Sequence, residues 1–188
     1  RSFDVNKPGT NIDKLVGGVL GGSLKQGKLS IKDKIEIRPG LRIEKEGKTT
    51  LQPIIAEIES LVTGNVNVNE VTPGGSIGML TKLDPSIVKS DFLAGNIVGY
   101  VGKLPDVWYE LDLEPRLLDR VVGTKDELRV EPIKKGETLM LNVNSAATIG
   151  IVTELKKDKI HVKLKVPVCA DIKDRVTISR LLGSRFRL

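Results

Sequence analysis

The stretch GSLKQGKL, residues 22–29, carries the residue types of a phosphate-binding loop: a glycine, four intervening residues, and then Gly-Lys. In such a loop a Ser or Thr directly after the lysine holds magnesium, and a helix begins there whose N–H groups hold phosphate. Leu29 stands at that position, and Ser30 comes one residue late. The residues that follow alternate like a strand. We therefore expect a hairpin, with strands at 15–20 and 29–37, rather than a nucleotide site.

Other combinations of residues that could support catalysis are sparse. His161 is the only histidine and Cys169 the only cysteine. Alternation places His161 on an outward face with no evident Ser or Cys partner, so we expect no nucleophilic triad. Cys169 lies in the apolar run VPVCA and is expected to be a buried thiol. No metal-ligand cluster is indicated, and an enzyme with a hidden nucleotide site stays only as an alternative.

Basic residues gather near the end of the chain. The net charge is +6, and residues 156–188 hold ten Lys and Arg against three Asp and Glu. This bias favours a polyanionic partner, although a lysine-rich solvated surface explains it equally well. Arginine is suited to bidentate phosphate contacts, so Arg180 and Arg185 are the first candidates. Aromatic residues make up only 3% of the chain, which argues against a base-stacking platform of many rings.

Short strands are the elements that must carry these residues. Apolar residues alternate in 33–39, in 54–62 and in 159–166, and Gly and Pro separate the runs. Two sets of side chains are expected to face inward: Ile54, Ala56, Ile58, Ser60 and Val62 in the second run, and Ile160, Val162, Leu164 and Val166 in the third. One short helix is predicted at Asp84–Val88, with Asp84 as its cap and Pro85 in its first turn.

The pattern predicts an all-β fold of two packed barrels, each with six or seven strands. The strand pattern breaks at GKLPDVW, residues 102–108, so we expect domains at 1–103 and 106–188. The absence of a disulfide framework, of a signal peptide and of a transmembrane run predicts a reducing, cytoplasmic location and no membrane partner.

A family resemblance rests on fragments that follow one another in order through the whole chain. They are RSFDVNKPGT (1–10), GGVLGGSLKQG (17–27), EIRPG (36–40), TPGG (72–75), TKLDP (81–85), LLDRVVG (117–123), ETLMLNV (137–143), PVC (167–169) and ISRLLGSRFRL (178–188). Together they resemble the second and third domains of the gamma subunit of archaeal and eukaryotic translation initiation factor 2. The chain begins with Arg rather than Met, and we expect it to be a piece of a longer protein that also contains a GTP-binding domain.

The resemblance implies two β-barrels of the translation-factor type, like the second and third domains of elongation factor Tu, with the last strand incomplete at Leu188. It also implies a factor that brings methionylated initiator tRNA to the small ribosomal subunit. The implied partners are the tRNA, the alpha subunit, that ribosomal subunit and the GTPase domain of the full-length chain. No cofactor is expected in this piece, which should not be an enzyme, whereas GTP and magnesium are expected in the complete protein.

Site residues follow from the same resemblance. The candidates for RNA binding are Gly21, Gly22, Arg38, Gly74, Gly75, Lys163, Lys165, Arg180 and Arg185. The extension 41–52 is the candidate for contacts with the alpha subunit, through Arg42, Glu44, Lys45 and Lys48. Two alternatives stay open: the barrels of another tRNA-carrying GTPase, such as the selenocysteine-specific elongation factor, and a subunit-docking module without direct RNA contact.

Overall fold

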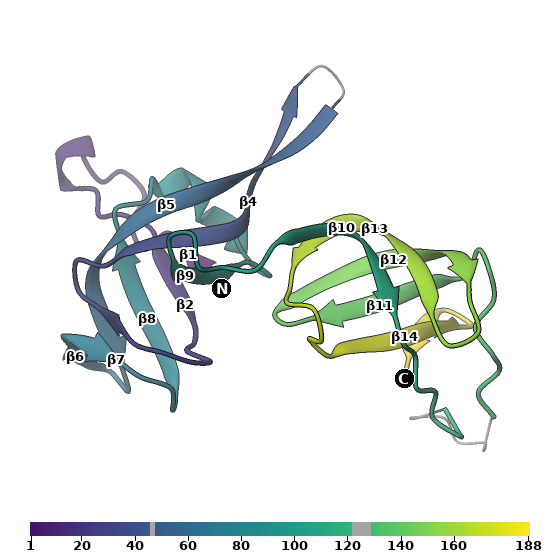
Figure 1. Ribbon diagram of the computed structural model, residues 1–188. Coiled ribbons are helices and arrows are strands. Elements are labelled where there is room, and N and C mark those ends of the chain that lie inside the picture. Colours follow the sequence, from purple (N-terminus) through teal and green to yellow (C-terminus); the bar gives the residue numbers. More distant parts are fainter. Residues whose placement is uncertain (46–47, 122–128) are drawn as a thin grey trace. The chain divides into compact units, whose positions relative to one another are not determined.

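The computed structural model describes residues 1–45, 48–121 and 129–188, with the backbone alone for residues 45, 48 and 49. The chain forms two compact units, Arg1–Leu104 and Pro105–Leu188 (Figure 1). Their boundary falls inside the predicted segment 102–108. Strands dominate both units and the helices are single turns, which confirms the predicted all-β class.

Unit 1 contains nine strands and three short 3-10 helices among its described residues. These elements are β1 (Ser2–Phe3), η1 (Ile12–Lys14), β2 (Val19–Ser23), β3 (Leu29–Ser30), β4 (Lys34–Lys45), β5 (Lys48–Thr63), β6 (Val66–Val68), β7 (Glu70–Val71), β8 (Ser76–Thr81), η2 (Pro85–Ile87), η3 (Lys89–Asp91) and β9 (Ile97–Tyr100). The main sheet has the order β1-β2-β8-β5-β4-β9, with β6 paired to β5, and β3 pairs with β7 in a second, smaller sheet. The predicted helix at Asp84–Val88 is confirmed as η2, where the Asp84 carboxylate accepts a hydrogen bond from Ser86 N–H at 2.8 Å.

The core of unit 1 is formed by the inward residues of these strands, and one β-bulge changes which residues they are. Ile54, Ala56 and Ile58 are buried, as the alternation predicts. The register of β5 with β8 then shifts between Ile58 and Ser60. Because a bulge adds one residue to the strand, the side-chain alternation changes phase there. Leu61 is therefore buried, and the inward positions predicted for Ser60 and Val62 are wrong.

The predicted hairpin at 15–20 and 29–37 is also wrong. β2 pairs with β1 and β8, β3 pairs with β7, and β4 pairs with β5 and β9, so neither part of 29–37 pairs with β2. The chain does continue from Lys28 into β3 and then β4 without an intervening helix. The Lys28 ammonium lies 3.2 Å from a carboxylate oxygen of Glu70. The helix that a phosphate-binding loop requires does not follow this lysine.

The far halves of β4 and β5 form a ribbon that extends from the main sheet (Figure 1). Residues 41–45 pair with 48–52, and among the described residues no other strand flanks either side of this segment. Gly40 lies at its base with φ +91°, and a Cβ there would lie 2.0 Å from the carbonyl oxygen of Gln52. Only glycine fits this close approach of two backbones. We call residues 41–45 and 48–52 the ribbon.

Unit 2 is one six-stranded sheet among its described residues, in the order β10-β13-β12-β11-β14-β15. Its strands are β10 (Val107–Leu113), β11 (Thr138–Val143), β12 (Ala146–Leu155), β13 (Ile160–Cys169), β14 (Val176–Leu182) and β15 (Arg185–Arg187). Every neighbouring pair in this sheet is antiparallel.

The core of unit 2 confirms most of the predicted alternation in β13. Ile160, Val162 and Leu164 are buried, and so is Val168. Val166 is 44% exposed, so its predicted inward position is wrong. Its N–H donates to the Thr148 hydroxyl at 3.1 Å, and that hydroxyl donates to the Val166 carbonyl at 2.8 Å. A side chain has taken over the hydrogen bonds that a regular ladder would supply at this residue.

Candidate nucleic-acid interface

A bare stretch of backbone lies on the outer face of β2 and β8. Gly21 is directly opposite Gly78 in the ladder of these two strands. Their strand neighbours Leu20, Ile77 and Met79 are buried, so both glycines face away from the core. A Cβ at Gly78 would meet no heavy atom within 4 Å. A ligand can therefore approach the peptide groups at Gly78 without meeting a side chain, whereas side-chain atoms of Phe3 and Arg1 lie beside Gly21.

Apolar side chains border this bare stretch. In the next row of the sheet Phe3 is opposite Val19, and Val19 is opposite Leu80. Phe3 is 46% exposed, and its ring edge lies 3.3 Å from the position that a Cβ of Gly21 would take. We call the surface of Phe3, Val19, Gly21, Gly78 and Leu80 the glycine shelf. It offers a flat floor beside an aromatic ring and two aliphatic side chains.

The structure brings the two predicted glycine loops together at one end of this shelf. Gly22 follows Gly21 in β2, and Gly74 and Gly75 form the turn that precedes β8. Ser23 pairs with Ser76 where that turn enters the strand. Gly22, Gly74 and Gly75 are all exposed, and a Cβ at Gly22 or Gly74 would meet nothing within 4 Å. Sequence reasoning missed Gly78, Phe3, Val19 and Leu80, because only the β1-β2-β8 pairing puts them in the same place.

Arg38 lies elsewhere, on the part of β4 that pairs with β9. Its Nε is 2.8 Å from Oε1 of Glu36, and its Nη1 donates to the Leu104 carbonyl at 3.3 Å. Glu36 is 5% exposed, and its other oxygen accepts a hydrogen bond from Gly102 N–H at 2.8 Å. That hydrogen bond, aided by Arg38, lowers the pKa of Glu36 below its usual value. The arginine thus holds the segment that leads out of unit 1.

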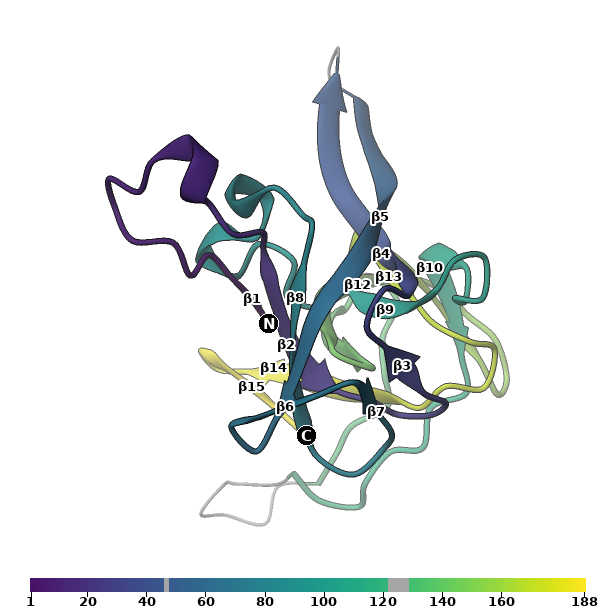
Figure 2. The same ribbon diagram turned by 90° about the vertical axis from the view of Figure 1, so that its left-hand side faces the viewer.

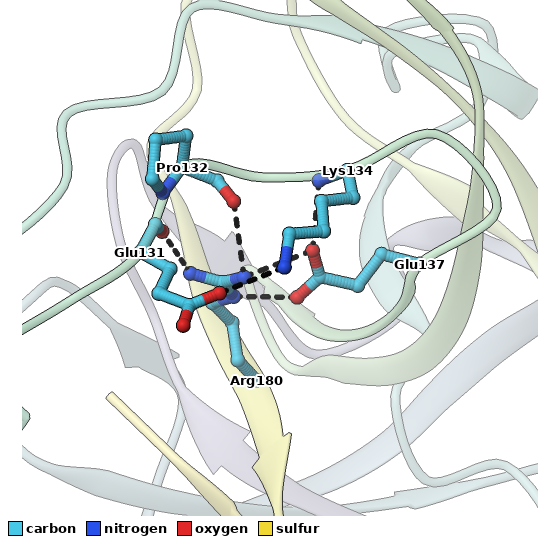
Figure 3. Close-up of polar contacts among 5 residues, drawn as sticks. All are labelled: Glu131, Pro132, Lys134, Glu137 and Arg180. Atoms are coloured by element: carbon cyan, nitrogen blue, oxygen red, sulfur yellow. Dashed lines mark hydrogen bonds and ion pairs between the residues drawn. The ribbon is translucent and has the colours of Figure 1, made fainter.

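Arg180 is also engaged within its own unit. Figure 3 shows its guanidinium between the Glu137 carboxylate and the carbonyl oxygens of Glu131 and Pro132. Its Nη2 donates to Oε2 of Glu137 at 2.9 Å and to the Pro132 carbonyl at 3.3 Å. The two side chains of the ion pair are 18% and 19% exposed. We call Arg180, Glu137 and the two carbonyl groups the Arg180 clamp.

The clamp holds the segment before β11 against β14. Burial raises the pKa of Glu137, but hydrogen bonds from Arg180 and from Lys134 N–H outweigh this effect, so the pKa lies below its usual value. The Lys134 ammonium in turn lies 2.8 Å from a carboxylate oxygen of Glu131. Because the donors of Arg180 are directed at partners inside unit 2, little of the guanidinium is left for a phosphate.

The remaining basic candidates of unit 2 face solvent. Lys163 and Lys165 are exposed on β13, and Arg185 is exposed on β15. Three strands separate β13 from β15 in the order of the sheet, so the structure does not gather these residues into one cluster. Lys163 lies opposite Glu110 in the ladder, which reduces the positive potential there.

His161 lies between two carboxylates rather than beside a nucleophile. Its Nδ1 is 2.9 Å from Oδ1 of Asp112, and its Nε2 is 3.3 Å from Oε2 of Glu110. The hydrogen bond with Asp112 is the main cause that raises the pKa of His161 above its ordinary value. Asp112 and Glu110 both lie on β10, beside the strand that carries the histidine. This arrangement is a cross-strand charge cluster, and Cys169 is buried.

The predicted subunit-binding residues lie on the ribbon. Arg42 and Glu44 are exposed, and Nη2 of Arg42 is 3.0 Å from Oε1 of Glu44. Lys45 and Lys48 are opposite each other in the ladder. Their side chains, and residues 46–47 of the predicted segment 41–52, lie outside the part of the chain that the structure describes.

No group of three metal-ligating side chains is present in residues 1–45, 48–121 and 129–188. The described helices include none long and apolar enough to cross a membrane.

A solved structure with a related fold comes from a bacterial selenocysteine-specific elongation factor. It covers 89% of this chain and 24% of that protein, with a TM-score of 0.62 and 18% identity. At this identity the likeness shows the fold alone, and it confirms the predicted translation-factor type of β-structure. It gives no support to the alternative that the chain belongs to such a factor.

Sequence comparison finds similarity to one family of translation factors. A family model described as the C-terminal part of initiation factor eIF2 gamma matches residues 109–188. Translation initiation factor 2 subunit gamma of Pyrococcus horikoshii is 61% identical over all 188 residues, and the corresponding subunit of Methanocaldococcus jannaschii is 50% identical. The chain spans 46% of the length of each of these relatives. The chain is thus similar in sequence, over its whole length, to translation initiation factor 2 gamma subunits.

Proposed function

We propose that this chain binds methionylated initiator tRNA and the alpha subunit, as part of a factor that delivers the tRNA to the small ribosomal subunit. The observation that carries the RNA part of the proposal is the glycine shelf. Two opposite glycines on adjacent strands, with open space at Gly78 and the Phe3 ring beside Gly21, form a surface on which another molecule can lie against the backbone.

The chemistry of the shelf suits the terminal nucleotide of the tRNA. A nucleobase is flat, and it can lie on peptide groups and on the exposed ring of Phe3, since stacking on an aromatic side chain stabilises single-stranded nucleic acid. Val19 and Leu80 add apolar contact area in the same row. Gly74 and Gly75, in the segment that leads into β8, extend the bare surface toward the sugar and the preceding nucleotide.

Phosphate contacts in unit 2 are assigned to Lys163, Lys165 and Arg185, which are exposed. Arg38 and Arg180 are left out of the proposed RNA-binding set, because their guanidinium groups are hydrogen-bonded inside their own units. Because few basic residues remain in the set, few phosphate contacts form, and the affinity for tRNA should fall only moderately as the salt concentration rises.

The alpha subunit is assigned to the ribbon. Its two strands have no flanking strand among the described residues, so their outer N–H and C=O groups are open to a partner. An added strand or loop can pair with such an edge, and Arg42 and Glu44 supply charges that select the partner. The GTPase domain, GTP and magnesium belong to the rest of the full-length protein in this proposal. The 188-residue chain then has no GTPase activity.

The test compares Gly78→Val with Asn67→Val, because a Cβ at Gly78 meets no neighbouring atom and Asn67 is an exposed strand residue of β6 outside the shelf. Binding of labelled methionylated initiator tRNA to the 188-residue chain is titrated at two salt concentrations. We expect Gly78→Val to weaken binding by about tenfold or more, since a branched side chain covers the floor of the shelf, and its thermal stability is measured in parallel. Equal affinity of the two variants would contradict a role for the shelf in RNA binding.

Each alternative predicts a different set of ligands for the 188-residue chain. A docking module without RNA contact would bind the alpha subunit and show no saturable binding of the tRNA. An enzyme with a hidden nucleotide site would bind GTP and magnesium saturably in equilibrium dialysis. We expect the 188-residue chain to bind the tRNA and the alpha subunit and to retain no GTP.

A further inference from the structure

A loop rich in exposed apolar and basic residues lies beside the glycine shelf. Residues 4–16 leave β1 and return to β2, and Figure 2 shows this loop close to the segment that carries η2 and η3. Together the loop and residues 89–91 line an open hollow of about 650 Å³. Phe3 lines this hollow and also borders the shelf, so the two surfaces are continuous.

The loop is held in place by its own hydrogen bonds. The Asn6 side chain pairs with the backbone of Val16 at two points, since its Oδ1 accepts from the N–H and its Nδ2 donates to the carbonyl, both at 2.9 Å. A turn closes the far part, where Thr10 N–H donates to the Lys7 carbonyl at 3.1 Å. The hollow therefore has a defined wall before any ligand binds.

The acidic groups of the hollow are occupied by donors of the protein. Oδ1 of Asp4 accepts from the N–H of Asn6 at 3.0 Å and from its side-chain amide at 2.9 Å. Asp91 accepts from Ser2 N–H and from Arg1, both at 2.7 Å. The Arg1 guanidinium offsets the charge of Asp91, whereas the neutral donors of Asn6 hold the Asp4 carboxylate in place and leave its charge.

The basic groups of the hollow are available. Lys7 and Lys89 line it from opposite segments of the chain. Within the described residues the ammonium group of neither lysine makes an ion pair or a hydrogen bond. Apolar side chains line the hollow with them, since Phe3 is 46% and Leu15 42% exposed. Cationic groups next to exposed apolar side chains are the combination that single-stranded nucleic acid requires for its phosphates and bases.

We propose that this hollow binds the sugar-phosphate backbone of the single-stranded 3′ segment of an RNA whose last base lies on the glycine shelf, with Lys7 and Lys89 in contact with its phosphates. The proposal rests on the proposed function of the shelf and extends it by a second contact one or more nucleotides upstream. The hollow thereby fixes the direction in which the strand leaves the shelf.

The experiment measures the salt dependence of binding. Lys7→Gln/Lys89→Gln is compared with Lys14→Gln, because Lys14 belongs to the same loop but does not line the hollow. The dissociation constant for methionylated initiator tRNA is determined over a series of salt concentrations. Each phosphate contact to a single strand contributes about 0.7 to the slope of log K against log salt, so the double variant is expected to lose about 1.4 and Lys14→Gln about zero.

A second RNA locates the contact. With the same tRNA trimmed of its unpaired 3′ nucleotides, the double variant and the unaltered chain should bind alike. Equal slopes for the double variant and Lys14→Gln on the intact tRNA would overturn the inference and leave the shelf unaffected. Absence of tRNA binding by the unaltered chain at every salt concentration would instead contradict the proposed function itself.

Discussion

At the Arg180 clamp the protein itself occupies the hydrogen-bonding groups of a predicted RNA contact, whereas at the glycine shelf the predicted contact surface stays open. The sequence predicts an RNA contact at both Gly21 and Arg180. In the folded chain Gly21 faces outward beside an open floor, whereas Arg180 donates to Glu137 and to two carbonyl groups. A residue type indicates what a group can bind, but only its neighbours in the fold decide whether that capacity remains free.

The largest effect is expected from breaking the clamp. Arg180→Ala leaves the half-buried Glu137 carboxylate without its main partner, which should destabilise unit 2 by about 3 kcal/mol. Trp108, the only tryptophan, lies in unit 2 and reports its urea unfolding by fluorescence. Arg185→Ala serves as the control, because this exposed arginine should change stability by less than about 0.5 kcal/mol. If Arg180→Ala kept full stability and lost tRNA affinity, Arg180 would be an RNA contact rather than a clamp residue.

A second effect separates glycines that the packing requires from those of the shelf. A Cβ at Gly17 would lie 1.8 Å from the carbonyl oxygen of Thr81, so Gly17→Ala must displace backbone and should cost about 2 kcal/mol. Gly78→Ala meets nothing and should stabilise unit 1 by about 0.5 kcal/mol, because glycine in a strand costs conformational entropy. Calorimetric unfolding of the two variants measures both changes. Destabilisation by Gly78→Ala would show that the shelf is part of the packing.

A third and smaller effect concerns pH. Asp112 raises the pKa of His161, so the stabilisation from this pair is fully present below the pKa of the unfolded chain, about 6.5, and is lost as the pH rises through the folded pKa. Unit 2 should therefore lose less than about 1 kcal/mol of stability between pH 6 and pH 8. His161→Asn should remove this dependence. An unaltered pH profile in the variant would show that other groups cause it.

Much of the fold could be predicted from local patterns. Alternation identified the inward residues Ile160, Val162 and Leu164, and the cap and proline of η2 were readable at Asp84 and Pro85. Prediction failed where a strand departs from regular geometry. A bulge before Ser60 buried Leu61, and no feature of the local sequence marks the place where that extra residue enters.

The candidate site was predicted only in part, because its other members depend on pairing between distant segments. Gly21 and Gly75 stand in glycine pairs that are visible in the sequence. Gly78 gains its importance only from its position opposite Gly21, which lies 57 positions earlier in the chain. Arg180 could not be recognised as a clamp residue for the same reason, since Glu137 lies 43 positions away. Local patterns contain no information about such partners.

The ribbon also has a consequence for local motion. Its two strands are continuous with the core parts of β4 and β5, yet its hydrogen bonds are not covered by further strands among the described residues. Amide groups in 41–45 and 48–52 should therefore exchange with solvent deuterium through local opening, much faster than those in 34–37 and 54–57. One pair of strands would thus show two rates of exchange. Slower exchange confined to the ribbon on addition of the alpha subunit would report docking there, without a label or a mutation.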